Sequence, residues 1–422
     1  MGELASGGFT ITPDPANADI IIVNTCSFIE SAINESVDEI LELAEFKKSG
    51  RCERFIVTGC LPERFRETLA ESLPEVDAFL GTGAYHKITE VLTHPPDQGL
   101  CLLPPLTGLP LQTHDTLRIP TTTAMAYLKV TEGCNRHCTY CIIPKLRGRL
   151  RSRTIADIEA EARQLISSGF REMVIIGQDT GCYGQDLASQ GYPDESLPPL
   201  LEKIAKISSD TWIRFLYGSP DTTDEKLIRT MAAHENICAY FDIPIQHTRS
   251  KILNRMGRHY DESTLLRLFD NIRKVIPKAA LRTTIMVGFP GETDNDFKQM
   301  LDFITTVRFD HLGAFTYSDS EDLSSHGLSG HVPADVAQER HHVLMSAQAK
   351  ISAEKNQTHI GHIYPVLVEE EIEAELFTGR TSFQAPEVDG IIYIDSADAV
   401  VGEFSHVKIC DALEYDLRGE TI

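Results

Sequence analysis

The chain has 422 residues and a formal net charge of −23, from 39 Lys and Arg against 62 Asp and Glu. This length predicts about three domains, and the charge argues against a protein held to nucleic acid by bulk electrostatics, because phosphate binding needs clustered cations. The apolar stretches are too short to span a bilayer, and ten cysteines are too few for a secreted disulfide scaffold, so we expect a cytoplasmic protein with thiols available for metal.

The first segment alternates short apolar runs with a helical pattern. Residues 20–23, 55–57 and 77–81 are predicted strands, and the first two are runs typical of buried parallel strands. Apolar residues recur at helical spacing over 29–44, which predicts a helix between the first two strands. From about residue 93 to 120 the sequence is rich in Pro, Thr and Gly and has no periodicity, which predicts a linker.

From residue 126 onward a strand-then-helix rhythm recurs six times. The candidate strands are 127–130, 173–176, 212–216, 240–243, 281–287 and 311–315. The clearest helical pattern between them covers 155–166, with Thr154 as its predicted N-cap. Six such units predict an α/β fold with a parallel sheet, either open or curled into a partial (βα)6 barrel.

The C-terminal region has a different texture. A polar helix is predicted over 333–355. Short, evenly spaced strands follow at 363–368, 373–377, 391–394, 406–409 and 415–417. Their spacing is typical of a small antiparallel β-barrel. Cys238 and Cys410 are interpreted as core residues, because free cysteine is commonly buried.

Three cysteines, Cys134, Cys138 and Cys141, lie within eight residues just after the first of the six strands. Soft thiolates at this spacing can occupy three corners of a metal site. A structural zinc needs four closed ligands, and no neighbouring His or Cys completes a zinc-finger pattern. A 4Fe-4S cluster with three cysteine ligands and one open iron fits better. Packed or free thiols remain an alternative.

The run from Glu132 to Cys141, Glu-Gly-Cys-Asn-Arg-His-Cys-Thr-Tyr-Cys, resembles the cluster motif of the radical SAM superfamily. The resemblance implies that the open iron binds the amino and carboxylate groups of S-adenosylmethionine. It further implies reductive cleavage to a 5′-deoxyadenosyl radical, which abstracts hydrogen from an unactivated carbon. The protein then has to position the cofactor and exclude competing reactions.

Two further cysteines, Cys26 and Cys60, each follow a predicted strand. If the helix between the strands is a right-handed crossover, the strands are parallel. Both cysteines would then emerge at the carboxyl edge of one sheet, where open α/β sheets bind ligands. The residues alone leave two readings open, a second metal site and a pair of buried structural thiols.

The segments around these cysteines, Val-Asn-Thr-Cys-Ser-Phe-Ile over 23–29 and Val-Thr-Gly-Cys over 57–60, resemble the second and third cysteine motifs of the radical SAM methylthiotransferase family. In that family they help to hold an auxiliary 4Fe-4S cluster that carries the sulfur to be inserted. The resemblance covers essentially the whole chain. It implies an N-terminal methylthiotransferase domain over 1–95, a linker over 96–120, a radical SAM core over 121–356 and a TRAM-type β-barrel over 359–422.

One motif of the family has no counterpart in this sequence. The family's first auxiliary cysteine lies in a Gly-Cys-Pro-Lys segment on an earlier strand, and Cys52 and Cys101 lie in the wrong contexts to replace it. We therefore expect an incomplete N-terminal domain whose sheet has an exposed edge. Cys26 and Cys60 would hold the auxiliary cluster with its third ligand missing, so that site should be labile.

Five other residues are candidate contacts of the cofactor. Gln246 and His247 follow the fourth strand of the core, and Gly288 and Gly291 follow the fifth, where glycine permits close backbone approach to a ligand. Arg151 is one of five cations within nine residues after the cysteine run. The resemblance implies that these regions face S-adenosylmethionine or substrate carboxylates. A plain turn, a solvated histidine and a solvated basic loop are the respective alternatives.

The charge of the C-terminal barrel bears on the choice of substrate. The family modifies either an adenosine of transfer RNA or an aspartate of the twelfth protein of the small ribosomal subunit. Residues 361–422 carry 14 Asp and Glu against 3 Lys and Arg, a net charge of −11. Such a surface repels RNA and attracts a basic protein, although acidity can also serve solubility alone.

Segments at 178–180, 212–217, 240–247 and 385–390 also resemble the ribosomal-protein branch. We therefore interpret the chain as an enzyme that methylthiolates the β-carbon of that aspartate with two 4Fe-4S clusters and S-adenosylmethionine. The alternative is a transfer-RNA adenosine methylthiotransferase. An electron donor such as flavodoxin or ferredoxin is expected as a partner, and neither a membrane nor direct nucleic-acid binding is expected.

Overall fold

The computed structural model describes residues 1–94, 99–107, 109, 111, 113–115, 118 and 124–422, and it divides into two compact units. The first unit comprises residues 1–119, 132–137 and 141–151, and the second comprises residues 120–131, 138–140 and 152–422. Within the described residues, none of the helices has the length and apolar character needed to cross a membrane.

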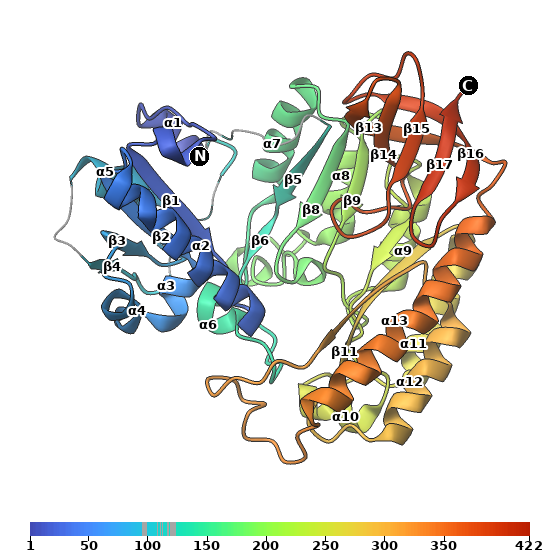
Figure 1. Ribbon diagram of the computed structural model, residues 1–422. Helices are drawn as coiled ribbons and strands as arrows, with labels where there is room; N and C mark the ends of the chain where they lie inside the picture. The colour runs from blue at the N-terminus through green and yellow to red at the C-terminus, as the bar shows by residue number, and fades with distance from the viewer. Residues whose placement is uncertain (95–98, 108, 110, 112, 116–117, 119–123) are drawn as a thin grey trace. The chain divides into compact units, whose positions relative to one another are not determined.

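A four-stranded parallel sheet in the order β1-β2-β3-β4 organises the first unit (Figure 1). Its strands are β1 (Ile20–Thr25), β2 (Arg54–Gly59), β3 (Ala78–Leu80) and β4 (Leu100–Leu102), and its helices are α1 (Gly2–Ser6), α2 (Glu30–Ser49), α3 (Cys60–Phe65), α4 (Glu67–Ser72) and α5 (Ile88–Thr93). The three predicted strands and the first helix are confirmed. β1 is an edge strand of this sheet. β4 lies within the predicted linker 96–120, much of which falls outside the described residues.

Both faces of this sheet are buried, which explains why its strands are apolar without alternation. On one face, Ile40 and Ala44 of α2 pack against Phe55 and Val57 of β2. On the other face, apolar side chains of β2 and β3 pack against α5. The carboxyl ends of the strands are thereby fixed from both sides.

The second unit is built on six parallel strands in two three-stranded sheets. They are β5 (Met125–Lys129), β8 (Glu172–Ile176) and β9 (Trp212–Phe215), then β10 (Tyr240–Asp242), β11 (Ala280–Val287) and β12 (His311–Thr316). Ile213 of β9 forms a parallel bridge with Ile237, which lies three residues before β10. All six predicted strands are confirmed, and the sheets together form the core that the βα rhythm predicted.

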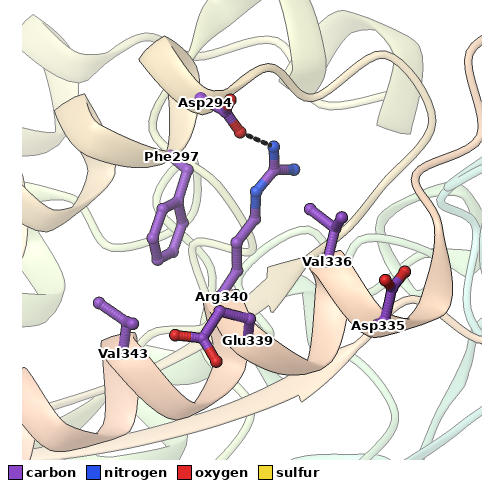
Figure 2. A pocket seen from close by; sticks show the side chains of 7 residues that line it. All are labelled: Asp294, Phe297, Asp335, Val336, Glu339, Arg340 and Val343. Atoms are coloured by element: carbon purple, nitrogen blue, oxygen red, sulfur yellow. Dashed lines mark hydrogen bonds and ion pairs between the residues drawn. The ribbon is translucent and has the colours of Figure 1, made fainter.

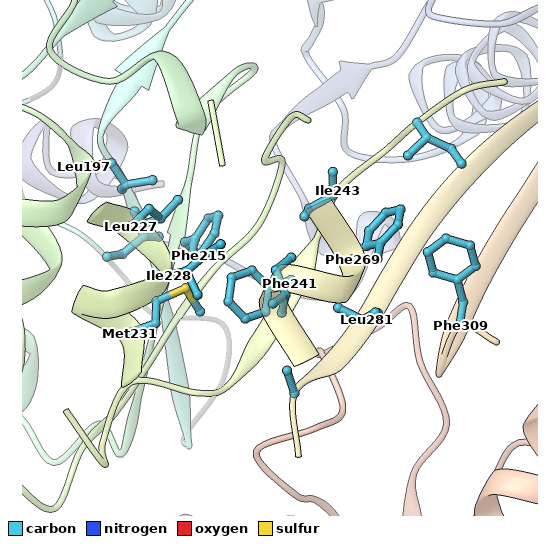
Figure 3. Close-up of a cluster of buried hydrophobic side chains, with 14 of the residues drawn as sticks. Leu197, Phe215, Leu227, Ile228, Met231, Phe241, Ile243, Phe269, Leu281 and Phe309 are labelled. Carbon is cyan, nitrogen blue, oxygen red and sulfur yellow. The ribbon is translucent and has the colours of Figure 1, made fainter. Parts of the chain in front are cut away.

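Helices cover one face of these strands. They are α7 (Ile155–Ser167), α8 (Leu197–Ala205), α9 (Glu225–Ala233), α10 (Ser250–Met256), α11 (Glu262–Val275), α12 (Asp294–Val307) and α13 (Ala334–Gln357). Thr154 is the N-cap of α7 as predicted, and its side chain accepts a hydrogen bond from the backbone N–H of Asp157. Phe215, Phe241 and Leu281 of the strands meet the helices in one large apolar core (Figure 3). In Figure 1, α13 (orange) runs beside α12.

The C-terminal strands close into a five-stranded barrel in the order β13-β14-β15-β17-β16. They are β13 (Ile363–Glu373), β14 (Leu376–Arg380), β15 (Ile392–Asp395), β16 (Phe404–Ala412) and β17 (Leu417–Thr421). Five strands cannot alternate in direction all the way round a closed barrel. One neighbouring pair must therefore be parallel, and it is β15 with β17, whereas the other pairs are antiparallel.

Two sequence predictions for the barrel need correction. The predicted strand over 373–377 spans a hairpin, because Glu373 ends β13 and β14 begins at Leu376. Cys410 is exposed rather than in the core, since Val407 and Ile409 of β16 point inward and place the intervening and following residues outside. Cys238, in contrast, is buried as predicted.

The segment between β14 and β15, residues 381–391, is called the docking loop here because it packs against the core strands of the same unit. Side chains on the face of the strands opposite the large core, including Tyr240 and Ala280, form an apolar cluster with Ala385 of this loop. Asp389 accepts hydrogen bonds from the Tyr240 hydroxyl at 2.6 Å and from the Ala385 N–H at 2.8 Å. The docking loop therefore completes the core on its second face.

A buried ionic network joins the core and the barrel. Glu172 of β8 accepts hydrogen bonds from Arg214 of β9 and from Arg380 of β14, each at 2.7 Å. All three side chains are at most 1% exposed. Arg214 also donates to the carbonyl of Ser382 at 2.9 Å, and Arg380 pairs with Glu369. The Glu172 carboxylate, shared by Arg214 and Arg380, therefore connects the core strands to the barrel.

Candidate functional site

The loop with Cys134, Cys138 and Cys141 follows the short strand β6 (Thr131–Glu132) and precedes the short helix α6 (Ile143–Arg147). None of these three cysteines forms a disulfide; Cys134 is buried and the other two are partly buried. Cys134 and Cys141 belong to the first unit and Cys138 to the second. The N–H of Arg136 donates to the Cys134 sulfur at 3.4 Å. Backbone N–H donors of this kind favour a negatively charged sulfur.

The residues directly after Cys138 are held firmly within the second unit. The N–H of Thr139 donates to the carbonyl of Met256 at 3.1 Å, and its carbonyl accepts from the N–H of Ser325 at 3.0 Å. The Tyr140 ring packs edge-on against Phe289, and Arg258 donates to its hydroxyl at 3.1 Å. Burial raises the pKa of Tyr140, so this side chain stays neutral. The aromatic residue of the motif thus anchors the loop.

The donor set of this loop suits an iron–sulfur cluster better than zinc. The loop offers three soft sulfur atoms on irregular backbone, and a cluster bound by three cysteines would keep a fourth position open for another molecule. Across the described part of the chain, no three His, Cys, Asp or Glu side chains are gathered closely enough to hold a metal ion. The ligand assignment for Cys134, Cys138 and Cys141 therefore stays a prediction.

Cys26 and Cys60 lie at neighbouring positions of the first unit's sheet. β1 and β2 are parallel with Thr25 opposite Gly59, and each cysteine is the next residue along its strand. Cys26 is exposed, whereas Cys60 is buried at the start of α3. Gly59 has φ of +107°, and a Cβ there would lie 2.6 Å from the Thr25 carbonyl oxygen, so the turn that presents Cys60 requires glycine.

One polar residue near these cysteines was not singled out from the sequence. Arg147 is one of the five clustered cations that follow the cysteine run, and its Nη2 donates to the Cys60 sulfur at 3.3 Å. The two residues are 87 positions apart. Arg147 is the last residue of the short helix α6, and nothing in the local sequence predicts its contact with Cys60. The contact arises only because α6 packs within the first unit.

Gln246 and His247 follow β10 in the second unit, as predicted. Gln246 is buried with φ of +63°, and its Oε1 has no hydrogen-bond partner among the described residues. His247 is fully buried, and its Nδ1 accepts from the N–H of Arg249 at 3.0 Å, which places the ring proton on Nε2. Nε2 lies 3.5 Å from the Glu292 carboxylate. The unpartnered Gln246 oxygen is an available acceptor for a bound molecule.

The loop with Gly288 and Gly291 is connected to His247 through the same carboxylate. Glu292 accepts a hydrogen bond from the Gly288 N–H at 3.0 Å and pairs with Arg340 of α13 at 2.8 Å. Gly288 has φ of +76°, and a Cβ there would lie 2.5 Å from the Cβ of Ala337. Close packing of α13 accounts for glycine at 288, and this packing does not depend on a ligand.

Arg340 also lines a hollow between α12 and α13 together with apolar and acidic side chains (Figure 2). There its guanidinium pairs with Asp294 at 2.6 Å. The other predicted cation, Arg151, lies in the first unit and donates to the carbonyl of Leu109 at 2.7 Å. Contact of Arg151 with a cofactor stays a prediction.

Three family models match the chain, and they cover most of its length. Residues 128–304 match the radical SAM superfamily, residues 360–422 match the TRAM domain, and residues 1–81 match uncharacterized protein family UPF0004. Among solved structures, the radical S-adenosylmethionine methyltransferase TsrM from Kitasatospora setae is 14% identical with a TM-score of 0.54. That match covers 70% of this chain and 61% of TsrM, and at this identity it shows the shared fold.

Curated relatives match over the whole chain. The ribosomal protein uS12 methylthiotransferase RimO of Desulfosudis oleivorans is 50% identical, covering 100% of this chain and 95% of that protein. The proteins of the same name from Clostridioides difficile and Syntrophotalea carbinolica are 47% and 44% identical, covering 100% of this chain and 94% and 92% of theirs. With this identity over its full length, the chain belongs to the ribosomal protein uS12 methylthiotransferase family of radical SAM enzymes.

Proposed function

We propose that this radical SAM methylthiotransferase acts on ribosomal protein uS12 and transfers a methylthio group to the β-carbon of an aspartate. The observation that carries the proposal is the 50% identity, over all 422 residues, to a relative named for this activity. A transfer-RNA adenosine methylthiotransferase is not favoured, because the curated relatives named above are ribosomal-protein enzymes.

Five cysteines are proposed to hold two 4Fe-4S clusters. Cys134, Cys138 and Cys141 would bind the catalytic cluster, whose open position takes S-adenosylmethionine, and Cys26 and Cys60 would bind the auxiliary one. When bound, these groups supply the electron and the radical that remove a hydrogen atom from an unactivated carbon, and the sulfur that replaces it. Two neighbouring thiols at the carboxyl edge of one sheet support the auxiliary assignment.

The other proposed site residues position the cofactor. The buried Oε1 of Gln246 is available to accept a hydrogen bond from S-adenosylmethionine. His247 accepts a hydrogen bond from the Arg249 N–H and lies 3.5 Å from Glu292, and the same Glu292 accepts a hydrogen bond from the backbone N–H of Gly288. This arrangement keeps the loops after β10 and β11 in one conformation, so that binding does not have to order them.

The acidic barrel is proposed to attract the basic substrate. Its net charge of −11 includes exposed carboxylates along β13, at Glu370, Glu371 and Glu373. Glu369 is different, since its carboxylate pairs with the buried Arg380 and so serves the fold. Complementary charge would speed association at low ionic strength. The proposal further includes flavodoxin or ferredoxin as the electron donor. It places the protein in the cytoplasm, where ribosomal proteins are available, and it expects no direct binding to nucleic acid.

The test is anaerobic turnover of the reconstituted protein with purified uS12 and, separately, with transfer RNA. Mass spectrometry of digested uS12 should locate a methylthio group on an aspartate, and transfer RNA should stay unmodified. A Cys138→Ala protein prepared in the same way is the control and should leave both substrates unchanged. Methylthiolated transfer RNA together with unmodified uS12 would refute the proposal.

A further inference from the structure

Arg147 lies among three polar groups of the first unit. Its Nη2 donates to the Cys60 sulfur at 3.3 Å, its Nη1 lies 3.7 Å from the Glu132 carboxylate, and it hydrogen-bonds the Tyr85 side chain. The Arg147 side chain is only 21% exposed. A long cationic side chain gives up rotamer freedom and hydration to be buried in this way, so its contacts must compensate for both losses.

The backbone at both ends of the Arg147–Cys60 contact is fixed. The Thr82 hydroxyl donates to the carbonyl of Leu146, the residue before Arg147, at 2.5 Å. The N–H of Thr82 donates to Glu63 at 3.0 Å, and Glu63 belongs to α3, the helix that Cys60 begins. Thr82 therefore links α6 to α3. The backbone from which Arg147 extends is therefore fixed relative to the helix that begins at Cys60.

We propose that Arg147 is a positioning residue for the auxiliary cluster, acting through its N–H···S hydrogen bond to Cys60. The inference rests on the proposed function, in which Cys60 is a cluster ligand. Hydrogen bonds to ligand sulfurs and nearby positive charge stabilise the more reduced, more negative form of an iron–sulfur cluster, and so raise its reduction potential. A guanidinium is suited to this role because it stays charged and directs its N–H groups in a rigid plane.

The position of Arg147 in the chain gives the contact a second consequence. It is six residues after Cys141, at the end of α6, the helix that directly follows the loop with the proposed ligands of the catalytic cluster. The Arg147–Cys60 hydrogen bond therefore ties the segment that carries the catalytic ligands to a ligand of the auxiliary cluster. Loss of the guanidinium should loosen the auxiliary site even where all the cysteines are present.

The experiment isolates the auxiliary cluster in the full chain by replacing Cys134, Cys138 and Cys141 with Ala. After anaerobic reconstitution, an EPR-monitored redox titration measures its midpoint potential, and a timed challenge with an iron chelator measures iron retention. In this background Arg147→Gln should lower the potential and speed iron loss several-fold. Arg147→Lys keeps the charge but loses the planar geometry, and it should fall between Arg147→Gln and the parent.

Arg149→Gln is the matched control, because Arg149 is an exposed cation only two residues after Arg147. It should leave both the potential and iron retention at the parent values. Equal potentials and equal iron retention for the parent, Arg147→Gln and Arg147→Lys would overturn the inference alone, leaving the proposed function intact. A parent that binds no iron in the triple-alanine background would overturn the inference and the auxiliary-cluster part of the proposed function together. Circular dichroism of each variant verifies that the first unit is folded.

Discussion

Replacing Glu172 by Gln would remove the charge that two buried guanidinium groups share. Arg214 and Arg380 each donate to this carboxylate at 2.7 Å, and neither cation is exposed to water. Glutamine has nearly the same shape, but its amide nitrogen is a donor and would face one of the two cations. The substitution therefore leaves the buried charge of Arg214 uncompensated, which is the costly way to break an ionic network, whereas Arg380 keeps its pair with Glu369.

Breaking a buried ion pair by removing one partner costs about 3–5 kcal/mol of the free energy of unfolding. We expect Glu172→Gln to reach this range, because the carboxylate serves two cations at once. Arg171, the preceding residue, provides a matched control, since it also connects the core to the barrel through its pair with Glu403. Those side chains are 34% and 51% exposed, and removal of an exposed pair costs less than about 1 kcal/mol.

The chain carries its own probe for this measurement. Its single tryptophan, Trp212 of β9, contacts Phe404 of the barrel with ring centroids 4.6 Å apart. Trp212 fluorescence during urea denaturation therefore follows the junction between core and barrel, and linear extrapolation gives its free energy of unfolding. A loss under about 1 kcal/mol for Glu172→Gln, matching that of Arg171→Gln, would refute the reasoning.

The same network predicts an acid dependence. Burial by itself raises the pKa of Glu172, but the charges of Arg214 and Arg380 and their hydrogen bonds outweigh it and hold that pKa below its usual value. A carboxylate with a lowered pKa in the folded state contributes stability above its unfolded pKa, and this contribution is lost as the pH falls through the folded pKa. Stability of the Trp212 transition should therefore fall in acid, and Glu172→Gln should reduce that dependence.

Three further predictions concern the proposed site and substrate. Cys138→Ala should abolish formation of 5′-deoxyadenosine, measured by chromatography, and a wild-type rate would contradict its assignment as a ligand. Cys60→Ala should lower the iron bound per chain after reconstitution, whereas Cys52→Ala, which replaces another buried thiol of the same unit, should not; equal iron contents would count against the auxiliary site. Glu370→Lys combined with Glu371→Lys should slow association with uS12 at low salt, measured by surface plasmon resonance, and the difference should shrink as salt screens the charges. An unchanged association rate would remove the electrostatic argument.

Local sequence patterns predicted the strands and the placement of Cys26 and Cys60 well. Short β-branched runs are typical of buried parallel strands. When two neighbouring strands are parallel, the residues that follow their carboxyl ends lie next to each other. The prediction for Cys410 was wrong. Its exposure is set by the alternation of buried and exposed residues along β16, which outweighs the general tendency of cysteine to be buried.

Contacts between distant segments could not be predicted. The docking loop has no periodicity of its own, and its partner Arg214 is 168 residues from Ser382. Arg147 resembles its neighbouring cations in sequence, and only the packing of α6 near α3 distinguishes it. Such contacts depend on tertiary packing, which a single sequence without relatives does not encode in any local pattern.

The docking loop also bears on how the protein is made. During synthesis, the six parallel strands of the core leave the ribosome before residues 381–391, which complete their second face. Until then Glu172 and Arg214 lack Arg380, and Tyr240 lacks the carboxylate of Asp389. N-terminal segments generally fold first as a chain emerges, and exposed apolar surface at that stage favours aggregation. We therefore expect the nascent core to stay incomplete, and to be a client of chaperones, until the last part of the chain has been translated.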